Sequence, residues 1–262
     1  MPDPDAYLQV EGATLRYRDS GTGPVVVLMH GWTLDLQMWE PQVERLAGCR
    51  RLVRFDRRGH GLSGGSPAPG QDVADLAALC RHLGLDNIVL VGMSQGARSA
   101  LGFAAAAPAM VRALVLDGAP DLDPAAPPSD IPLEYLRGVL QTQGLDAFRS
   151  QWRQHPHMRL HTTDPAMRRL LDGMLARYAG LDLREAATAE RALPARVPLA
   201  DISAPTLVLN GALDLVSRSA AADYLCSQLP RAQRLLIDAA GHLPNLDRPQ
   251  DYAEALGRAS RI

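Results

Sequence analysis

The chain has 262 residues, 47% of them hydrophobic, and a formal net charge of −2. This length suits one large α/β domain with a full-sized core, and the near-neutral charge gives no reason to expect nucleic acid as a partner. Its three cysteines are far apart and lack a metal-ligand spacing, which argues against a disulfide framework or a zinc site. The acidic N-terminus does not resemble a signal peptide, and no apolar run approaches the roughly 18 residues that span a membrane. We therefore expect a cytoplasmic protein with free thiols and no membrane partner.

Short apolar runs predict the strands of a sheet. The first two runs alternate between apolar and polar residues, as expected for a half-exposed antiparallel hairpin. The later runs are β-branched or leucine-rich without alternation, as expected for parallel strands that are covered on both faces. In chain order, the predicted strands are 7–10, 13–20, 24–30, 51–56, 87–92, 112–118, 206–211 and 233–238.

Stretches with helical spacing of apolar residues separate or follow the later strands. They cover residues 38–48, 72–84, 97–108, 218–229 and 249–260. Two antiparallel strands followed by repeated β-α units predict an α/β fold, with a mainly parallel eight-stranded sheet and helices on both of its faces.

The alternation of strands and helices stops between Pro120 and about Ala204. A proline-rich run, DLDPAAPPSDIP, opens this stretch, which has helical patterns at 132–142, 144–155 and 164–178 but no clear strand. We interpret residues 121–201 as a helical cap inserted after the sixth strand. Residues 1–120 and 202–262 then form the core domain.

Ser94 lies in the G-x-S-x-G pattern Gly92-Met93-Ser94-Gln95-Gly96, after a predicted strand and before a predicted helix. A serine on such a sharp turn adopts strained backbone angles, and side chains two residues away on either side would collide with neighbouring elements. The helix would also direct its free N-terminal N–H groups at the serine. This context predicts a nucleophile, with an ordinary tight turn as the alternative.

A serine nucleophile needs a general base, and the base needs an acid that orients it and stabilises its cation. His242 directly follows the last predicted strand and is our candidate base. Asp214 follows the seventh strand and is the candidate acid, while Asp117 at the end of the sixth strand is its rival. Three histidines lie in the insertion, and we expect them on the surface or in the cap. They are His155, His157 and His161.

An oxyanion hole requires two backbone N–H groups that converge where a carbonyl oxygen becomes negative. We expect one from Gln95, the residue after the nucleophile. The other should come from Trp32, in the HGW loop after the third strand. Gly31 would let this loop approach the serine closely.

Four motifs together resemble the α/β-hydrolase superfamily. They are MHGW (29–32), FDRRGHGLS (55–63), VGMSQG (91–96) and the pair GALD…AGH. The last two carry the candidate residues in the order Ser…Asp…His, which is the order of that superfamily. The runs LDLQMWEPQV and VRFDRRGHGLS are most similar to the enol-lactonase, non-haem haloperoxidase and aryl esterase group. The serine argues against haloalkane dehalogenases and epoxide hydrolases, which have an aspartate at this position. The chain departs from the G-x-S-M-G-G pattern of many relatives at Gln95 and Ala97, so we expect the Gln95 side chain to change the polarity of the pocket.

The residues and the resemblance imply a serine hydrolase that cleaves a small-molecule carboxylic ester or lactone through an acyl-enzyme. No metal or organic cofactor is implied. The alternatives are a carbon–carbon bond hydrolase, lyase or transacylase on the same triad, and a ligand receptor with slow turnover. The residues that we expect to line the pocket, with core packing as the alternative for each, are Leu34, Met38, Met93, Trp152, Met158 and Leu243.

Overall fold

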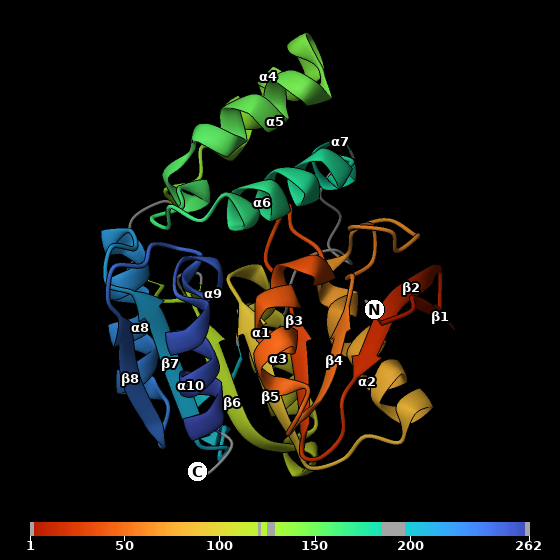
Figure 1. Cartoon of the computed structure of the whole chain (residues 1–262), viewed down its shortest axis with the longest axis vertical. Coiled ribbons are helices and arrows are strands. Elements are labelled where there is room, and N and C mark those ends of the chain that lie inside the picture. The colour runs from red at the N-terminus through yellow and green to blue at the C-terminus, as the bar shows by residue number, and fades with distance from the viewer. Residues whose placement is uncertain (1–2, 120–121, 125–128, 185–196, 260–262) are drawn as a thin grey trace.

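An eight-stranded sheet forms the centre of the molecule (Figure 1), in a computed structural model that describes residues 3–119, 122–124, 129–184 and 197–259. The strand order is β1-β2-β4-β3-β5-β6-β7-β8. β2 pairs antiparallel with β1 and β4, and all other neighbours are parallel, so the predicted mainly parallel sheet is confirmed. The strands are β1 (Ala6–Val10), β2 (Ala13–Ser20), β3 (Val25–Met29), β4 (Arg51–Phe55), β5 (Ile88–Met93), β6 (Val111–Asp117), β7 (Thr206–Gly211) and β8 (Ala232–Ile237).

The central strands are buried on both faces, which explains their unbroken apolar sequences. In β3, Val26 and Leu28 pack in one hydrophobic cluster, whereas Val27 and Met29 pack in another on the opposite face. Successive side chains of a strand point to opposite faces, so a strand between two helical layers needs an apolar residue at every position.

Helices cover both faces of the sheet. α1 (Glu40–Leu46) and α10 (Pro249–Ala259) pack in the cluster that contains Val26, and α2 (Asp72–Leu83), α3 (Gln95–Ala106) and α8 (Val216–Gln228) pack in the cluster that contains Val27. α9 (Pro244–Asp247) is a single turn before α10. In the described part of the chain, no helix is long and apolar enough to cross a membrane. Short 3₁₀ helices lie at Leu36–Trp39, Pro69–Gln71, Pro108–Met110, Pro156–Met158 and Leu199–Asp201.

In the described part of the segment between β6 and β7, four α-helices lie beyond one end of the sheet, at the top of Figure 1. They are α4 (Leu133–Gln143), α5 (Leu145–Gln154), α6 (Pro165–Arg177) and α7 (Leu181–Arg184). They leave the core after β6, so they lie at the carboxyl end of the parallel strands, where open α/β sheets bind their ligands. The predicted boundary between residues 120 and 121 lies outside the described residues. Near the second predicted boundary, Leu199 already packs with the core.

Candidate active site

Ser94 occupies a strained turn between β5 and α3. Its backbone angles are φ 53° and ψ −116°, and its N–H donates to the Asp117 carbonyl at 2.7 Å. A Cβ on Gly92 would lie 2.4 Å from the Gly96 carbonyl oxygen, and a Cβ on Gly96 would lie 2.6 Å from that of His30. Both distances are shorter than any real contact, so the two glycines are required for the turn to form.

His242 and Asp214 meet beside this turn. Nδ1 of His242 lies 3.1 Å from both carboxylate oxygens of Asp214. The carboxylate also accepts hydrogen bonds from the Asn210 side-chain amide at 3.0 Å and from the Leu215 N–H at 2.8 Å. Burial raises the pKa of Asp214, but its attraction to His242 and these hydrogen bonds outweigh burial and hold the pKa below its ordinary value. Asp214 is therefore a carboxylate that faces the imidazole.

Ser94 and His242 both line a small cavity of about 10 Å³, roughly the room that one water molecule needs. In the described part of the chain the two side chains form no direct hydrogen bond, which is common in hydrolases without substrate. Four of the expected pocket residues line this cavity, namely Leu34, Met93, Trp152 and Met158.

The structure corrects the pocket prediction for two side chains. Met38 and Leu243 line neither cavity that reaches Ser94, among the described residues, and both are fully buried in the core. The Met38 carbonyl accepts a hydrogen bond from the Asn245 side chain at 2.8 Å. We predicted them as pocket residues because they lie close to motifs in the sequence, but such closeness does not determine which way a side chain points.

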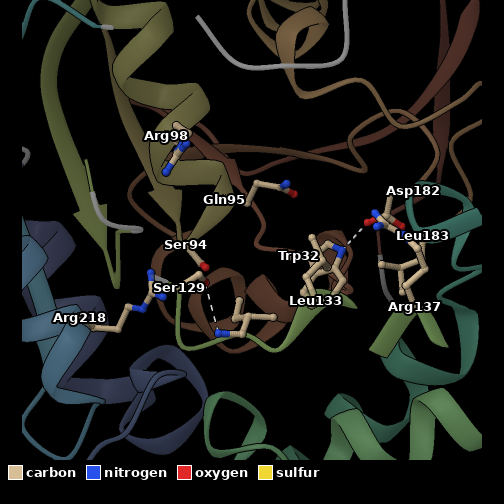
Figure 2. Close-up of a pocket in the computed structure, with 11 residues that line it drawn as sticks. Trp32, Ser94, Gln95, Arg98, Ser129, Leu133, Arg137, Asp182, Leu183 and Arg218 are labelled. Carbon is tan, nitrogen blue, oxygen red and sulfur yellow. Dashed lines mark hydrogen bonds between the residues drawn. The ribbon is translucent and has the colours of Figure 1, made fainter. Parts of the chain in front are cut away.

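A second, larger cavity of about 380 Å³ also reaches Ser94 (Figure 2). Gln95 and Trp32 line it beside the serine, and helices of the insertion supply its far wall. Its charged lining residues are Arg98, Arg137, Arg218 and Asp182. Ser94 therefore lies where a small, mainly apolar cavity and a large, charged one meet.

Comparison with known proteins identifies this architecture. A family model of the α/β-hydrolase fold matches residues 24–249. The chain belongs to this family. The superfamily resemblance inferred from the motifs is thereby confirmed, and the strained serine turn of this α/β-hydrolase lies at the position that its motif predicts.

Individual relatives cover nearly the whole chain. A pimeloyl-[acyl-carrier protein] methyl ester esterase of Xanthomonas campestris is 32% identical over 91% of this chain and 95% of its own length. Among solved structures, an esterase from Thermogutta terrifontis has a TM-score of 0.82 and 28% identity, and covers 98% of both chains. A bromoperoxidase from Bacillus anthracis has a TM-score of 0.85 and 25% identity, over 99% of this chain and all of its own.

The HGW loop passes directly against the nucleophile turn of this α/β-hydrolase. A Cβ on Gly31 would lie 3.3 Å from the Ser94 Cβ and 2.6 Å from the Met93 sulfur. The next residues are Trp32 and Thr33, and Thr33 has a φ of 62°. Within the described ranges, the backbone N–H groups of Trp32 and Gln95 donate to no acceptor. Two free donors thus flank the serine.

Arg57 connects the two loops that carry these donors. Its backbone N–H donates to His30 Nε2 at 2.9 Å, and its guanidinium donates to Gln95 Oε1 at 2.5 Å and to Asp72 at 2.9 Å. The side chain is 1% exposed. The Gln95 side chain lines the large cavity, as expected of a polar residue there, but Arg57 also anchors it. The sequence signal for Arg57 was the pair of adjacent arginines in FDRRGHG, of which it is the first.

Asp117, the rival acid, faces elsewhere. Its carboxyl accepts a hydrogen bond from the Tyr252 hydroxyl at 3.1 Å and is fully buried. Burial raises the pKa of Asp117 well above its ordinary value, and the nearby Asp214 raises it further, against the effect of the Tyr252 hydrogen bond. Asp214, not Asp117, makes the hydrogen bonds to His242.

His157 is a site residue that the sequence analysis missed. We expected it on the surface or in the cap. It lies in the cap, and what we did not expect is that it is buried with its ring centroid 4.4 Å from that of His242, edge to face. Burial, assisted by the neighbouring His242, lowers the pKa of His157 to about 2, so its ring is neutral. His157 stacks with His155, which stacks on Trp152. The grouping of these aromatic rings around Pro156 was the feature of the sequence that could have indicated a buried position for His157.

Asp247 fastens the cap to the loop of His242. Its carboxylate accepts from the Gly241 N–H at 2.8 Å, from the His161 N–H at 2.6 Å and from the Thr162 N–H at 3.0 Å. His161 and Thr162 belong to the insertion, whereas Gly241 precedes the candidate base. Within the described residues, no group of three or more His, Cys, Asp or Glu side chains is placed to hold a metal ion.

Proposed function

We propose that this α/β-hydrolase cleaves carboxylic esters through an acyl-enzyme on Ser94. One observation carries the proposal: His242 is hydrogen-bonded to the Asp214 carboxylate and shares a cavity with a serine on a strained strand-to-helix turn. The esterase names of the Xanthomonas and Thermogutta relatives support an ester as the substrate.

In the proposed mechanism, His242 removes the proton from the Ser94 hydroxyl as the oxygen attacks the ester carbonyl. The Asp214 carboxylate holds the imidazole in one tautomer and stabilises its cation. The N–H groups of Trp32 and Gln95 bind the oxyanion that forms. His242 then protonates the leaving alcohol and, in the second half of the reaction, activates the water that releases the acid.

The insertion completes the proposed site. We assign residues 121–201 to a cap over a core formed by 1–120 and 202–262, because Trp152 and Met158 line the cavity that contains Ser94 and His242. A lactone has the same carbonyl chemistry with a tethered leaving group, so lactones belong to the proposed substrate range. The three free cysteines fit a reducing compartment such as the cytoplasm.

The test is steady-state kinetics on methyl, p-nitrophenyl and lactone substrates, together with labelling by a fluorophosphonate. We expect Ser94-dependent hydrolysis and a single covalent adduct, which mass spectrometry of the digested protein assigns to Ser94. Hydrolysis that persists in a folded Ser94→Ala variant, or an adduct on another residue, would overturn the mechanism.

A further inference from the structure

Thr33 is a strained residue of the HGW loop. Its φ of 62° lies in the left-handed region, which a β-branched residue rarely adopts because its Cβ crowds the backbone there. Thr33 directly follows Trp32, the expected oxyanion donor, and the loop passes against Ser94. A relaxation of the Thr33 backbone angles would therefore displace the Trp32 N–H relative to the serine.

The Thr33 side chain is held by the insertion. Trp152, which belongs to α5, donates its indole N–H to Thr33 Oγ1 at 2.8 Å. Both residues are buried, so the loss of this hydrogen bond would leave a polar group without water to replace its partner. The Trp152 ring also packs edge to face against the Trp32 ring, with centroids 4.8 Å apart. One side chain of the insertion thus contacts both the strained residue and the donor before it.

Two further helices of the insertion hold the loop on either side of Thr33. Before Thr33, the Trp32 indole N–H donates to the Asp182 carboxylate of α7, as the dashed line in Figure 2 shows. After Thr33, the Arg177 guanidinium of α6 donates to the buried Asp35 carboxylate at 2.7 Å. Hydrogen bonds to ionised groups are stronger than those between neutral groups. Three helices of the insertion therefore converge on the HGW loop.

We propose that the insertion positions the oxyanion hole, with Trp152 as the positioning residue that holds Thr33 in its left-handed conformation. Without the indole N–H, Thr33 relaxes toward ordinary backbone angles, and the Trp32 N–H moves away from the oxygen that becomes negative. Oxyanion donors act in the transition state, so the loss falls on kcat and not on KM. The proposal rests on the serine-hydrolase function and gives the insertion a part in its chemical steps.

A double-mutant cycle tests the hydrogen bond itself. Trp152→Phe removes the indole N–H and keeps an aromatic ring, and Thr33→Val removes Oγ1 and keeps the branched shape. We expect each variant to lower kcat on a p-nitrophenyl ester about 10-fold with little change in KM, less than the 10²–10³ lost with a whole donor. The double variant should lose no more than either single variant, because both remove the same interaction. Thermal melting checks that each variant is folded.

Thr33→Gly separates backbone strain from packing. Glycine adopts a positive φ without strain, so it does not need the hydrogen bond from Trp152. We therefore expect Thr33→Gly to retain more kcat than Thr33→Val, although it removes more of the side chain. Trp152→Phe should also lower kcat less in the Thr33→Gly background than in the wild type. A threonine that only fills space would give the opposite order of the two Thr33 variants.

Trp39→Phe is the matched control. Trp39 is buried in the core, and among the described residues it lines neither cavity at Ser94 and its indole nitrogen has no hydrogen-bond partner. The same substitution at this position should lower the melting temperature and leave kcat and KM unchanged.

The contrary outcomes separate this positioning role from the function on which it rests. Additive losses in the double variant, a loss confined to KM, or a Thr33→Gly variant less active than Thr33→Val would show that Trp152 only shapes the cavity. Each would overturn the positioning role and leave the serine hydrolase intact, as would an equal loss of kcat in Trp39→Phe. Hydrolysis that does not depend on Ser94 would contradict the proposed function itself.

Discussion

Backbone strain concentrates in a few residues around the site. Four non-glycine residues have a positive φ in the described ranges, and they are Thr33, Asn87, Ser94 and Ala239. Thr33 follows the expected oxyanion donor Trp32, Ser94 is the proposed nucleophile, and Ala239 lies three positions before His242. Such conformations cost about 1–3 kcal/mol each and persist only where the surrounding structure holds them. Packing of the fold therefore stabilises a site that the local chain would not adopt by itself.

The proposed triad predicts that substitutions of its members lower kcat by unequal factors. Ser94→Ala should lower kcat by on the order of a millionfold, because the nucleophile itself is removed. Asp214→Asn should lower kcat roughly 10⁴-fold, because an amide stabilises the wrong tautomer of His242. Steady-state assays on one p-nitrophenyl ester measure both. An Asp214→Asn variant with wild-type kcat would show that another group orients the base.

Asp117 should affect stability rather than turnover. Its pKa in the folded protein is raised well above the ordinary 3.8, so the stability it contributes is present at low pH and is lost as the pH rises from about 3.8 through the raised pKa. Asp117→Asn resembles the neutral acid and lacks this loss. The free energy of unfolding of the Asp117→Asn variant minus that of the wild type should therefore increase with pH, by about 1.4 kcal/mol per pH unit across that window.

Urea unfolding at a series of pH values measures this difference. The esterase activity of Asp117→Asn serves as the control and should stay near that of the wild type, because Asp117 makes its side-chain hydrogen bond to Tyr252. A difference in stability that does not change with pH would mean that Asp117 is ionised in the folded protein.

At the scale of elements, two loops from distant parts of the chain build the expected oxyanion hole, and Arg57 holds them together. Arg57→Met should lower kcat by about 10- to 100-fold with little change in KM, since removing a whole oxyanion donor costs about 10²–10³. Arg57→Lys should restore part of the loss. The measurement is kcat and KM on one ester.

Arg58 provides the matched control for Arg57. It is the next residue in the same loop and is also buried, but it pairs with Asp75 at 2.6 Å and with the Glu11 carbonyl at 3.0 Å. Arg58→Met removes the same charge and should leave kcat unchanged while lowering the melting temperature. Equal loss of kcat in both variants would indicate general destabilisation instead of a specific effect on the oxyanion loops.

The strands and the proposed triad could be predicted because their signals are local. Ser94, Asp214 and His242 each directly follow a predicted strand, and Ser94 is framed by glycines that its own turn requires. Arg57 and Asp247 could not be assigned in this way, because their partners are distant in sequence: His161 lies 86 residues from Asp247. Only the folded topology brings such pairs together. The sequence therefore indicated the residues of the proposed triad but not the contacts that support them.

At the scale of the molecule, the cap and the core share one hydrophobic cluster. Phe148, Trp152 and Leu171 of the insertion belong to the same cluster as Leu28 and Tyr252 of the core. We therefore expect cap and core to unfold in one cooperative transition. Tryptophan fluorescence, which reports on Trp32 and Trp152 at their junction and on Trp39 in the core, should give the same midpoint as far-UV circular dichroism. Two separated transitions would show that the cap unfolds independently.

The attachment of the cap through Asp247 limits how substrates can reach Ser94. Lifting the cap at this point would strip a buried carboxylate of donors and pull on the loop that precedes His242. An open cap and an assembled triad would then exclude each other, so we expect substrate to reach Ser94 through the large cavity while the cap stays attached. We therefore expect an increase in solvent viscosity to slow the encounter with substrate, which kcat/KM includes, and to leave kcat unchanged, because no opening of the cap limits turnover.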